Sequence, residues 1–155
     1  MATITKDIDV NVPVRTAYNQ WTQFESFPQF MEGVKEVRQL DDRRLHWRAE
    51  IAGKEEAWEA EILEQVPERQ IAWRSVSGTP NAGTVVFEPI DDGHSRIMLT
   101  MEYEPQGLTE SVGSALGFDS RRVEGDLKRF KDMVESKGVE TGGYRGQIED
   151  SQIHN

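Results

Sequence analysis

The chain has 155 residues, no cysteine and a formal net charge of −10. Its length predicts one domain with one substantial core, and the absence of thiols excludes disulfides and thiolate metal sites. The acidic balance, with basic clusters only at Arg43-Arg44 and Arg121-Arg122, argues against nucleic acid as a partner and against docking on an anionic membrane.

The N-terminal region predicts a strand followed by two short helices. Residues 3–12 alternate between apolar and polar types, which is the period of a strand. Pro13 ends that strand and can open a helix at its first turn. Apolar residues then follow at helical spacing, interrupted by Pro28, and predict helices over 14–23 and about 25–31.

The middle of the chain predicts an antiparallel meander. Turn-forming residues such as Ala52-Gly53 and Asp91-Asp92-Gly93 separate successive strand patterns. Short connections of this kind join neighbouring antiparallel strands, so parallel crossovers are excluded. The six predicted strands cover residues 34–40, 43–51, 54–66, 69–76, 83–90 and 95–104.

The C-terminal part predicts one long helix and a polar tail. Apolar residues recur on one helical face between residues 109 and 137, with charged residues on the other. Residues 139–155 are polar and have no periodicity, so we expect a flexible, dispensable tail. The predicted domain therefore covers residues 1–138.

These elements together predict an α+β fold. A sheet of seven antiparallel strands twists and curls, and the long C-terminal helix must cover its concave side. The two short helices lie between strands one and two. We expect an apolar cavity of at least roughly 300 Å³ between sheet and helix.

The tryptophans are the first candidates for the wall of that cavity. A two-residue turn at 52–53 would place Trp47 directly opposite Trp58, and Trp73 lies in an inward phase two strand positions from Ile71. One interpretation is an aromatic wall for a planar apolar ligand, and the other is ordinary core packing. The pattern favours neither interpretation for the set of three.

Strand and helix phase add further candidates for ligand contact. They are the polar or aromatic residues in phase with the apolar positions, and the apolar residues on the helix face. A one-residue bulge in strand 54–66 would instead turn Glu59, Glu61 and Leu63 inward. The added candidates are Ser75, Phe87, Leu99, Met101, Tyr103, Leu116, Val123 and Leu127.

Catalytic and metal-binding motifs are absent from the sequence. The three histidines have no ligand spacing, and no nucleophile elbow, phosphate loop or dinucleotide fingerprint occurs. The charged residues of strands 43–51 and 54–66 predict a solvated outer face, on which His46 lies opposite Glu59. We therefore expect no metal and no cofactor, and the catalytic residues, if any exist, stay unknown.

Four segments resemble the helix-grip superfamily, which includes START lipid-transfer domains, the birch-pollen allergen and the polyketide cyclase/dehydrase proteins (SRPBCC). They are residues 21–37, with the aromatic-Pro-x-Phe-Met motif at 27–31, then 45–49, 64–73 with Val66-Pro67, and 125–130. The resemblance covers about residues 3–137 and is greatest to the bacterial cyclase/dehydrase-like branch. Aromatase/cyclases of this family carry an arginine just ahead of Val-Pro, where this chain has Leu63 and Gln65.

The resemblance implies three alternative functions. The first is binding or transport of a small hydrophobic molecule, such as a quinone, a lipid or a polyketide-like aromatic. The second is a cyclase or dehydratase, which needs an acid–base group facing the cavity. The third is a protein-interaction module, which needs an exposed apolar patch. No apolar run approaches the roughly 20 residues that span a bilayer, so we expect a cytoplasmic monomer or weak homodimer without stable membrane insertion.

Overall fold

The computed structural model describes residues 2–51, 54–78, 81–103, 120–137, 147–149 and 152–154. Its elements follow in this order along the chain: one strand, two short helices, a run of six strands, a long helix and two short strands. They are β1 (Ala2–Val10), α1 (Val14–Trp21), the 3₁₀ helix η1 (Phe24–Gln29), β2 (Val34–Gln39), β3 (Arg44–Ile51), β4 (Lys54–Val66), β5 (Gln70–Gly78), β6 (Asn81–Asp91), β7 (His94–Tyr103), α2 (Ser120–Lys137), β8 (Gln147–Glu149) and β9 (Gln152–His154).

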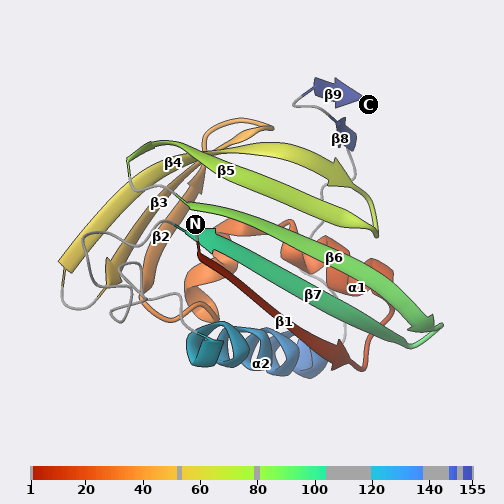
Figure 1. Cartoon of the computed structure of the whole chain (residues 1–155). Coiled ribbons are helices and arrows are strands. Elements are labelled where there is room, and N and C mark those ends of the chain that lie inside the picture. Colours follow the sequence, from red (N-terminus) through yellow and green to blue (C-terminus); the bar gives the residue numbers. More distant parts are fainter. Residues whose placement is uncertain are drawn as a thin grey trace.

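Strands β1 to β7 form the predicted curved antiparallel sheet, in the order β1-β7-β6-β5-β4-β3-β2. Figure 1 shows the sheet arching over α2, with α1 on the same side. No helix interrupts the described residues between β2 and β7, so the expected meander is confirmed. The concave side of this sheet holds the buried core.

The two short helices lie where the sequence predicts them, between β1 and β2. Helix α1 begins directly after Pro13, whose φ of −60° suits the start of a helix. The second helix is a 3₁₀ helix that contains Pro28, and this shorter form suits a residue that lacks the backbone N–H an α-helix needs.

The long helix covers the concave side through one apolar face. Val123, Leu127, Phe130 and Val134 are all buried, at spacings of four, three and four residues. At its C-terminal half, Lys131 Nζ donates to the Asp9 carbonyl and Glu135 accepts from the backbone N–H of Asn11, which ties α2 to the end of β1. Residues 109–119 of the predicted helix lie outside the described part.

Strand β4 carries irregular pairing that changes which side chains point inward. Trp58, Ala60 and Ile62 are buried as expected, so the bulge that would turn Glu59 and Glu61 inward does not occur. The register with β5 shifts between Glu59 and Ala60, where the extra residue lies in β5, and again between Ile62 and Glu64, where the extra residue is Leu63 of β4. Beyond this shift Gln65 is completely buried, and neither of its amide atoms has a hydrogen-bond partner.

The C-terminal segment contains two short strands that the sequence does not predict. Strand β8 pairs with β4 through Ile148 and Gln65, and β9 pairs with β8. At that position β4 extends past the beginning of β3, so β8 occupies an edge that β3 leaves open. The flexibility and dispensability of residues 139–155 stay predictions.

Candidate functional site

A stacked pair of tryptophans forms one wall of the site. Trp47 and Trp58 are directly paired across β3 and β4, and their rings stack with centroids 5.7 Å apart and an angle of 12° between the planes. Both side chains are buried, and neither indole N–H has a hydrogen-bond partner. The predicted register of the two residues is confirmed.

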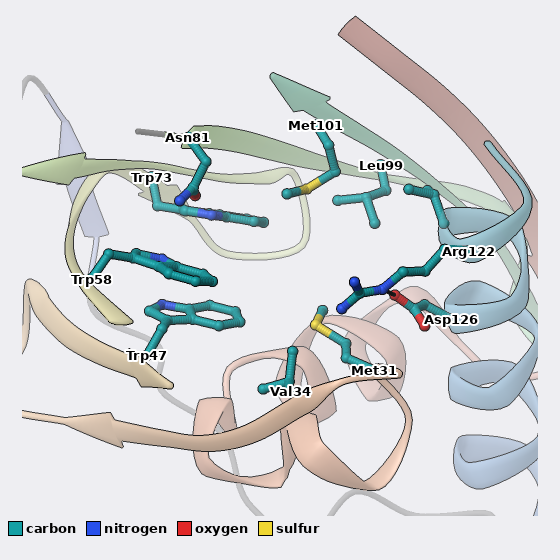
Figure 2. A pocket seen from close by; sticks show the side chains of 11 residues that line it. Met31, Val34, Trp47, Trp58, Trp73, Asn81, Leu99, Met101, Arg122 and Asp126 are labelled. Atoms are coloured by element: carbon teal, nitrogen blue, oxygen red, sulfur yellow. Dashed lines mark ion pairs between the residues drawn. The ribbon is translucent and has the colours of Figure 1, made fainter. Parts of the chain in front are cut away.

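Trp73 continues this wall because Gly83 leaves room for its ring. The two residues are paired across β5 and β6, and a Cβ at Gly83 would lie 2.4 Å from Trp73 Cζ2. The indole therefore lies flat across the backbone of β6 (Figure 2). A glycine covered by an aromatic ring on the neighbouring strand is a known device of curved sheets.

The tryptophans face α2 across a narrow cavity, which we call the slit. Figure 2 shows side chains from both layers and from the loop before β2 meeting around it. The slit is lined by Met31, Val34, Trp47, Trp58, Trp73, Asn81, Leu99, Met101, Arg122, Val123 and Asp126. Its volume is only about 20 Å³, enough for about one water molecule, so the expected cavity of at least 300 Å³ is wrong for this closed form.

Two charged residues of α2 form the polar end of the slit. Their side chains are only 8% and 9% exposed, and Arg122 Nε lies 4.0 Å from Asp126 Oδ2. Asp126 Oδ1 also accepts hydrogen bonds from the Glu32 backbone N–H, at 3.0 Å, and from Arg129. The guanidinium of Arg122 extends from the helix toward the space between Met31 and the tryptophans (Figure 2).

Burial changes the ionisation of the acid in this cluster. Desolvation raises the pKa of the Asp126 carboxyl above its ordinary value of 3.8. Hydrogen bonds from Glu32 and Arg129, and the positive charges of Arg122 and Arg129, oppose this rise in pKa. Asp126 is thus a buried acid whose charged form is stabilised by hydrogen-bond donors and by two nearby positive charges.

The same cluster holds the loop between η1 and β2 against α2. Arg129 Nε donates to the Phe30 carbonyl at 2.8 Å, two residues before Glu32. Gly33 follows with a φ of +82°, and a Cβ there would lie 2.8 Å from the Glu50 carbonyl oxygen and 3.3 Å from Arg122 Nη2. Only glycine fits this backbone conformation and this close approach without strain.

The structure brings six of the predicted ligand-contact residues together around the slit: Trp47, Trp58, Trp73, Leu99, Met101 and Val123. Three others lie elsewhere. Phe87 and Leu127 belong to the packed core, and Ser75 Oγ accepts a hydrogen bond from the Asn81 backbone N–H. The side chain of Tyr103 and all of Leu116 lie outside the described part of the chain.

Sequence reasoning missed the polar end of the slit and three further lining residues, Met31, Val34 and Asn81. Asp126 lies three residues after Val123 and one before Leu127, so a charged residue interrupts the apolar face of the helix. Arg122 precedes it by four residues, the spacing of an ion pair on one helix face. That pattern was a usable signal, whereas nothing local marks Met31 or Asn81 as lining residues.

The outer face of the sheet has the predicted solvated ion pairs. His46 Nδ1 lies 4.0 Å from Glu59 Oε2, and both side chains are substantially exposed. Arg48 donates to Glu55 on the same face. Within the described residues no group of three or more potential ligands could hold a metal ion. Of the two positions compared with the cyclase arginine, Gln65 points inward and Leu63 lies at the register shift.

Comparisons with known proteins agree with this architecture. Residues 10–132 match the family described as polyketide cyclase / dehydrase and lipid transport. An uncharacterized 17.2 kDa protein of Streptomyces lincolnensis is 48% identical over 149 residues, which cover 96% of this chain and 99% of the relative.

Solved structures share the fold over nearly the whole chain. A protein of Deinococcus radiodurans is 26% identical, covers 88% of this chain and 99% of its own, and superimposes with a TM-score of 0.72. A START superfamily protein of Mycobacterium smegmatis has a TM-score of 0.74 at 17% identity, covering 87% and 98% of the two chains. An aromatase/cyclase of Streptomyces sp. R1128 has a TM-score of 0.74 at 14% identity, covering 92% and 99%.

The chain thus belongs to the class of proteins with the helix-grip fold, a fold that it shares with the START superfamily protein. Within that class, the chain belongs to the polyketide cyclase/dehydrase and lipid transport family. Family and fold together support a ligand-binding or cyclase role. In the described part of the chain, no helix combines the length and the apolar character needed to cross a membrane.

Proposed function

We propose that the chain binds a small, planar, hydrophobic molecule in the slit, of the kind represented by a quinone or a polyketide-like aromatic. The stacked pair of Trp47 and Trp58 carries this proposal. The two indoles are stacked on each other and both line the slit, so they offer it an apolar aromatic surface, and aromatic rings favour edge-to-face or offset-stacked contacts with other rings.

The slit has to open to admit such a ligand. A cavity of about 150 Å³ accommodates benzene, whereas the slit has about 20 Å³. Two of its lining residues are methionines, Met31 and Met101, whose unbranched side chains repack at low cost. Opening therefore requires rearrangement of these two side chains, which lie in the loop before β2 and in β7, while the tryptophans stay in place.

The unpartnered indole donors are consistent with an oxygen-bearing ligand. A buried N–H without a partner costs about 1–3 kcal/mol, and both Trp47 and Trp58 carry one. A carbonyl oxygen on a bound quinone could accept from either indole. Binding would then recover part of the free energy that the closed form lacks.

A titration with menadione (2-methyl-1,4-naphthoquinone) tests the proposal. The chain has no cysteine, so this quinone has no thiol to alkylate. We expect saturable quenching of tryptophan fluorescence and a heat of binding by calorimetry that give the same dissociation constant. Trp58→Leu should weaken binding at least tenfold, while Trp58→Phe, which keeps a flat ring, should lose less.

A matched control is Val76→Ala, because Val76 is 43% exposed on β5 and does not line the slit. This variant should bind menadione like the wild type. The proposal fails if quenching does not saturate, or if the Trp58 and Val76 variants bind equally well.

A second candidate, a cyclase or dehydratase, is favoured by one observation. Asp126 lines the slit and burial raises the pKa of its carboxyl, as expected of a general acid. However, its carboxylate already accepts hydrogen bonds from Glu32 and Arg129. This arrangement suits a residue that holds the loop before β2 against α2 better than a residue that transfers protons. Mass spectrometry of a short poly-β-ketone incubated with the protein separates the two, because a carrier leaves the compound unchanged.

An interaction module is the least supported alternative. Among the described residues, the exposed large apolar side chains are Leu40, Val76 and Ile90. They come from three separate segments, the residue after β2, then β5 and β6, rather than from one helix or strand. We infer a cytoplasmic monomer or weak homodimer, whose mass in solution light scattering would measure directly.

A further inference from the structure

A second cavity lies on the outer side of the loop before β2. This surface groove has a volume of about 410 Å³ and is lined by residues 28–35 and by Arg129 of α2. Met31 and Val34 line both the groove and the slit, and the Met31 side chain points from the loop into the slit (Figure 2). Among the described residues, these two therefore form the partition between the slit and the groove.

The backbone of this loop is fixed at its two ends. We call residues 30–33 the strap. At one end the Met31 N–H donates to the Phe27 carbonyl at 2.8 Å, and at the other the Gly33 carbonyl accepts from the Glu50 N–H at 2.8 Å. These bonds join the strap to η1 on one side and to β3 on the other.

The middle of the strap is attached to α2 by two side chains. Asp126 Oδ1 accepts from the Glu32 backbone N–H at 3.0 Å, and Arg129 Nε donates to the Phe30 carbonyl at 2.8 Å. The two side chains are also bonded to each other, so loss of one weakens the hold of the other. These bonds can break while every strand and helix keeps its own hydrogen bonds.

The slit has a second flexible side chain, Met101, but its backbone is held on both sides. Met101 lies in β7 and is paired with Ile4 of β1 and with Gly83 of β6. A shift of its backbone would break the sheet, whereas the strap belongs to no strand. Of the two methionines, only Met31 is thus on a segment that can move away from the slit.

We propose that the ligand enters the slit from the groove, past Met31, and that the bonds of Asp126 and Arg129 to the strap control the rate of this exchange. When these bonds break, the strap moves outward and the slit and the groove become one cavity. Mobile loops that cover a binding site often limit exchange in this way. This inference rests on the proposed function, since it assigns the entry route and the kinetic control of the same site.

Stopped-flow tryptophan quenching with menadione tests the entry route. Arg129→Met removes the bonds to Phe30 and Asp126 and keeps an unbranched side chain at a position that is 43% exposed. Because one movement admits and releases the ligand, both the association and the dissociation rate constants should rise at least about tenfold, which corresponds to about 1.4 kcal/mol in the opening equilibrium. The dissociation constant should stay nearly unchanged.

Two further variants locate the effect. Lys128→Met makes the same charge change at an exposed neighbouring position whose ammonium group pairs with Glu124 instead of the strap, and its rate constants should equal those of the wild type. If Arg129→Met does not fold, Arg129→Lys keeps the charge but has no planar fork to bond Phe30 and Asp126 together. It should raise both rate constants by a smaller factor.

The outcomes separate this inference from the proposed function. If menadione does not bind to the wild type, both proposals fail. If it binds but the rate constants of the Arg129 variants equal those of the wild type, the slit is a ligand site and the ligand enters elsewhere. If only the dissociation rate constant rises, or if Lys128→Met has the same effect, the strap does not control exchange and the inference is overturned.

Discussion

Two aromatic groups lie on the concave side of the sheet, and they are packed differently. The first, which we call the Trp21 cluster, consists of Tyr18, Trp21, Phe27, Phe30, Phe87 and Phe130. The second is the slit wall of Trp47, Trp58 and Trp73. Every ring of the first group meets another at a steep angle, whereas two of the second group are stacked face to face.

The difference lies in what stands opposite each ring. Trp21 contacts four phenylalanines, with centroids between 4.9 and 6.2 Å away, and is completely buried. The rings of Trp47 and Trp58 face methionines and a charged pair across a cavity, and Trp47 contacts only one ring of the Trp21 cluster among the described residues, that of Phe27. A tryptophan surrounded by other rings, such as Trp21, is part of the packed core. A tryptophan opposite flexible side chains, such as Trp58, lines a cavity.

The largest expected effect separates the two groups by stability. Trp21→Ala should lower the free energy of unfolding by about 3–5 kcal/mol, the cost of removing a large aromatic side chain from a closed core. Trp58→Ala should cost at least about 1 kcal/mol less, because its cavity merges with the slit and the methionines can fill it. Urea denaturation of both variants measures this, and equal losses would contradict the distinction.

A smaller effect tests whether Gly83 keeps the slit wall flat. In Gly83→Ala the new Cβ would overlap the Trp73 ring, at 2.4 Å from Cζ2 and 2.6 Å from Cε2. Overpacking of this kind costs about 1–3 kcal/mol, and the displaced indole should weaken menadione binding. At Gly93 a Cβ would meet nothing nearer than Asp91 Oδ1 at 3.9 Å, so Gly93→Ala is the control and should alter neither property.

The pH dependence of stability sharpens the contrast further, because only the slit has a buried acid with a raised pKa among the described residues. A folded-state pKa above the unfolded one means that the folded protein binds the proton more tightly. The stability of the wild type relative to Asp126→Asn should therefore rise as the pH falls through the raised pKa. It should level off below about the ordinary value of 3.8.

Other carboxylates act in the opposite direction but cancel in this difference. The pKa values of Asp9 and Asp91 are lowered by hydrogen bonds from Arg96 and His94, so their stabilisation is lost on acidification in both proteins. Denaturation curves of wild type and Asp126→Asn between pH 3 and 7 isolate the single group. A difference that is constant, or that falls with decreasing pH, would show that burial does not raise the pKa of Asp126.

The smallest expected effect concerns the C-terminal segment, which belongs to neither aromatic group. Deletion of residues 142–155 removes β8, whose pairing with β4 involves one residue pair. The melting temperature should fall by no more than a few degrees, which for a domain of this size is about 1 kcal/mol. A larger fall in the deletion variant would mean that the segment contributes to the core.

The sequence predicted the architecture well because the relevant signals are local. Alternation, turn residues and one apolar helix face were enough to place the strands, α2 and the pairing of Trp47 with Trp58. The interior of β4 was not predictable in the same way. The register shift at Leu63 depends on how β5 pairs with β4, and it buries Gln65, which no periodic pattern would turn inward.

The candidate site was predictable only in part for the same reason. Its sheet side follows from strand phase, but Met31 reaches the slit through a loop held by Arg129 and Asp126. Phe87 had the correct phase and was expected at the site. It instead packs against Tyr18 and Trp21, because α1 covers that end of β6, a contact between elements distant in the sequence.

The most direct test of the ligand site is a titration of ¹⁵N-labelled protein with menadione, followed through the four indole N–H signals by nuclear magnetic resonance. Single Trp→Phe variants assign the signals. We predict that the signals of Trp47, Trp58 and Trp73 shift saturably with one common dissociation constant, while that of Trp21 stays in place. If all four signals shift alike, or if none saturates, the slit does not bind a planar ligand.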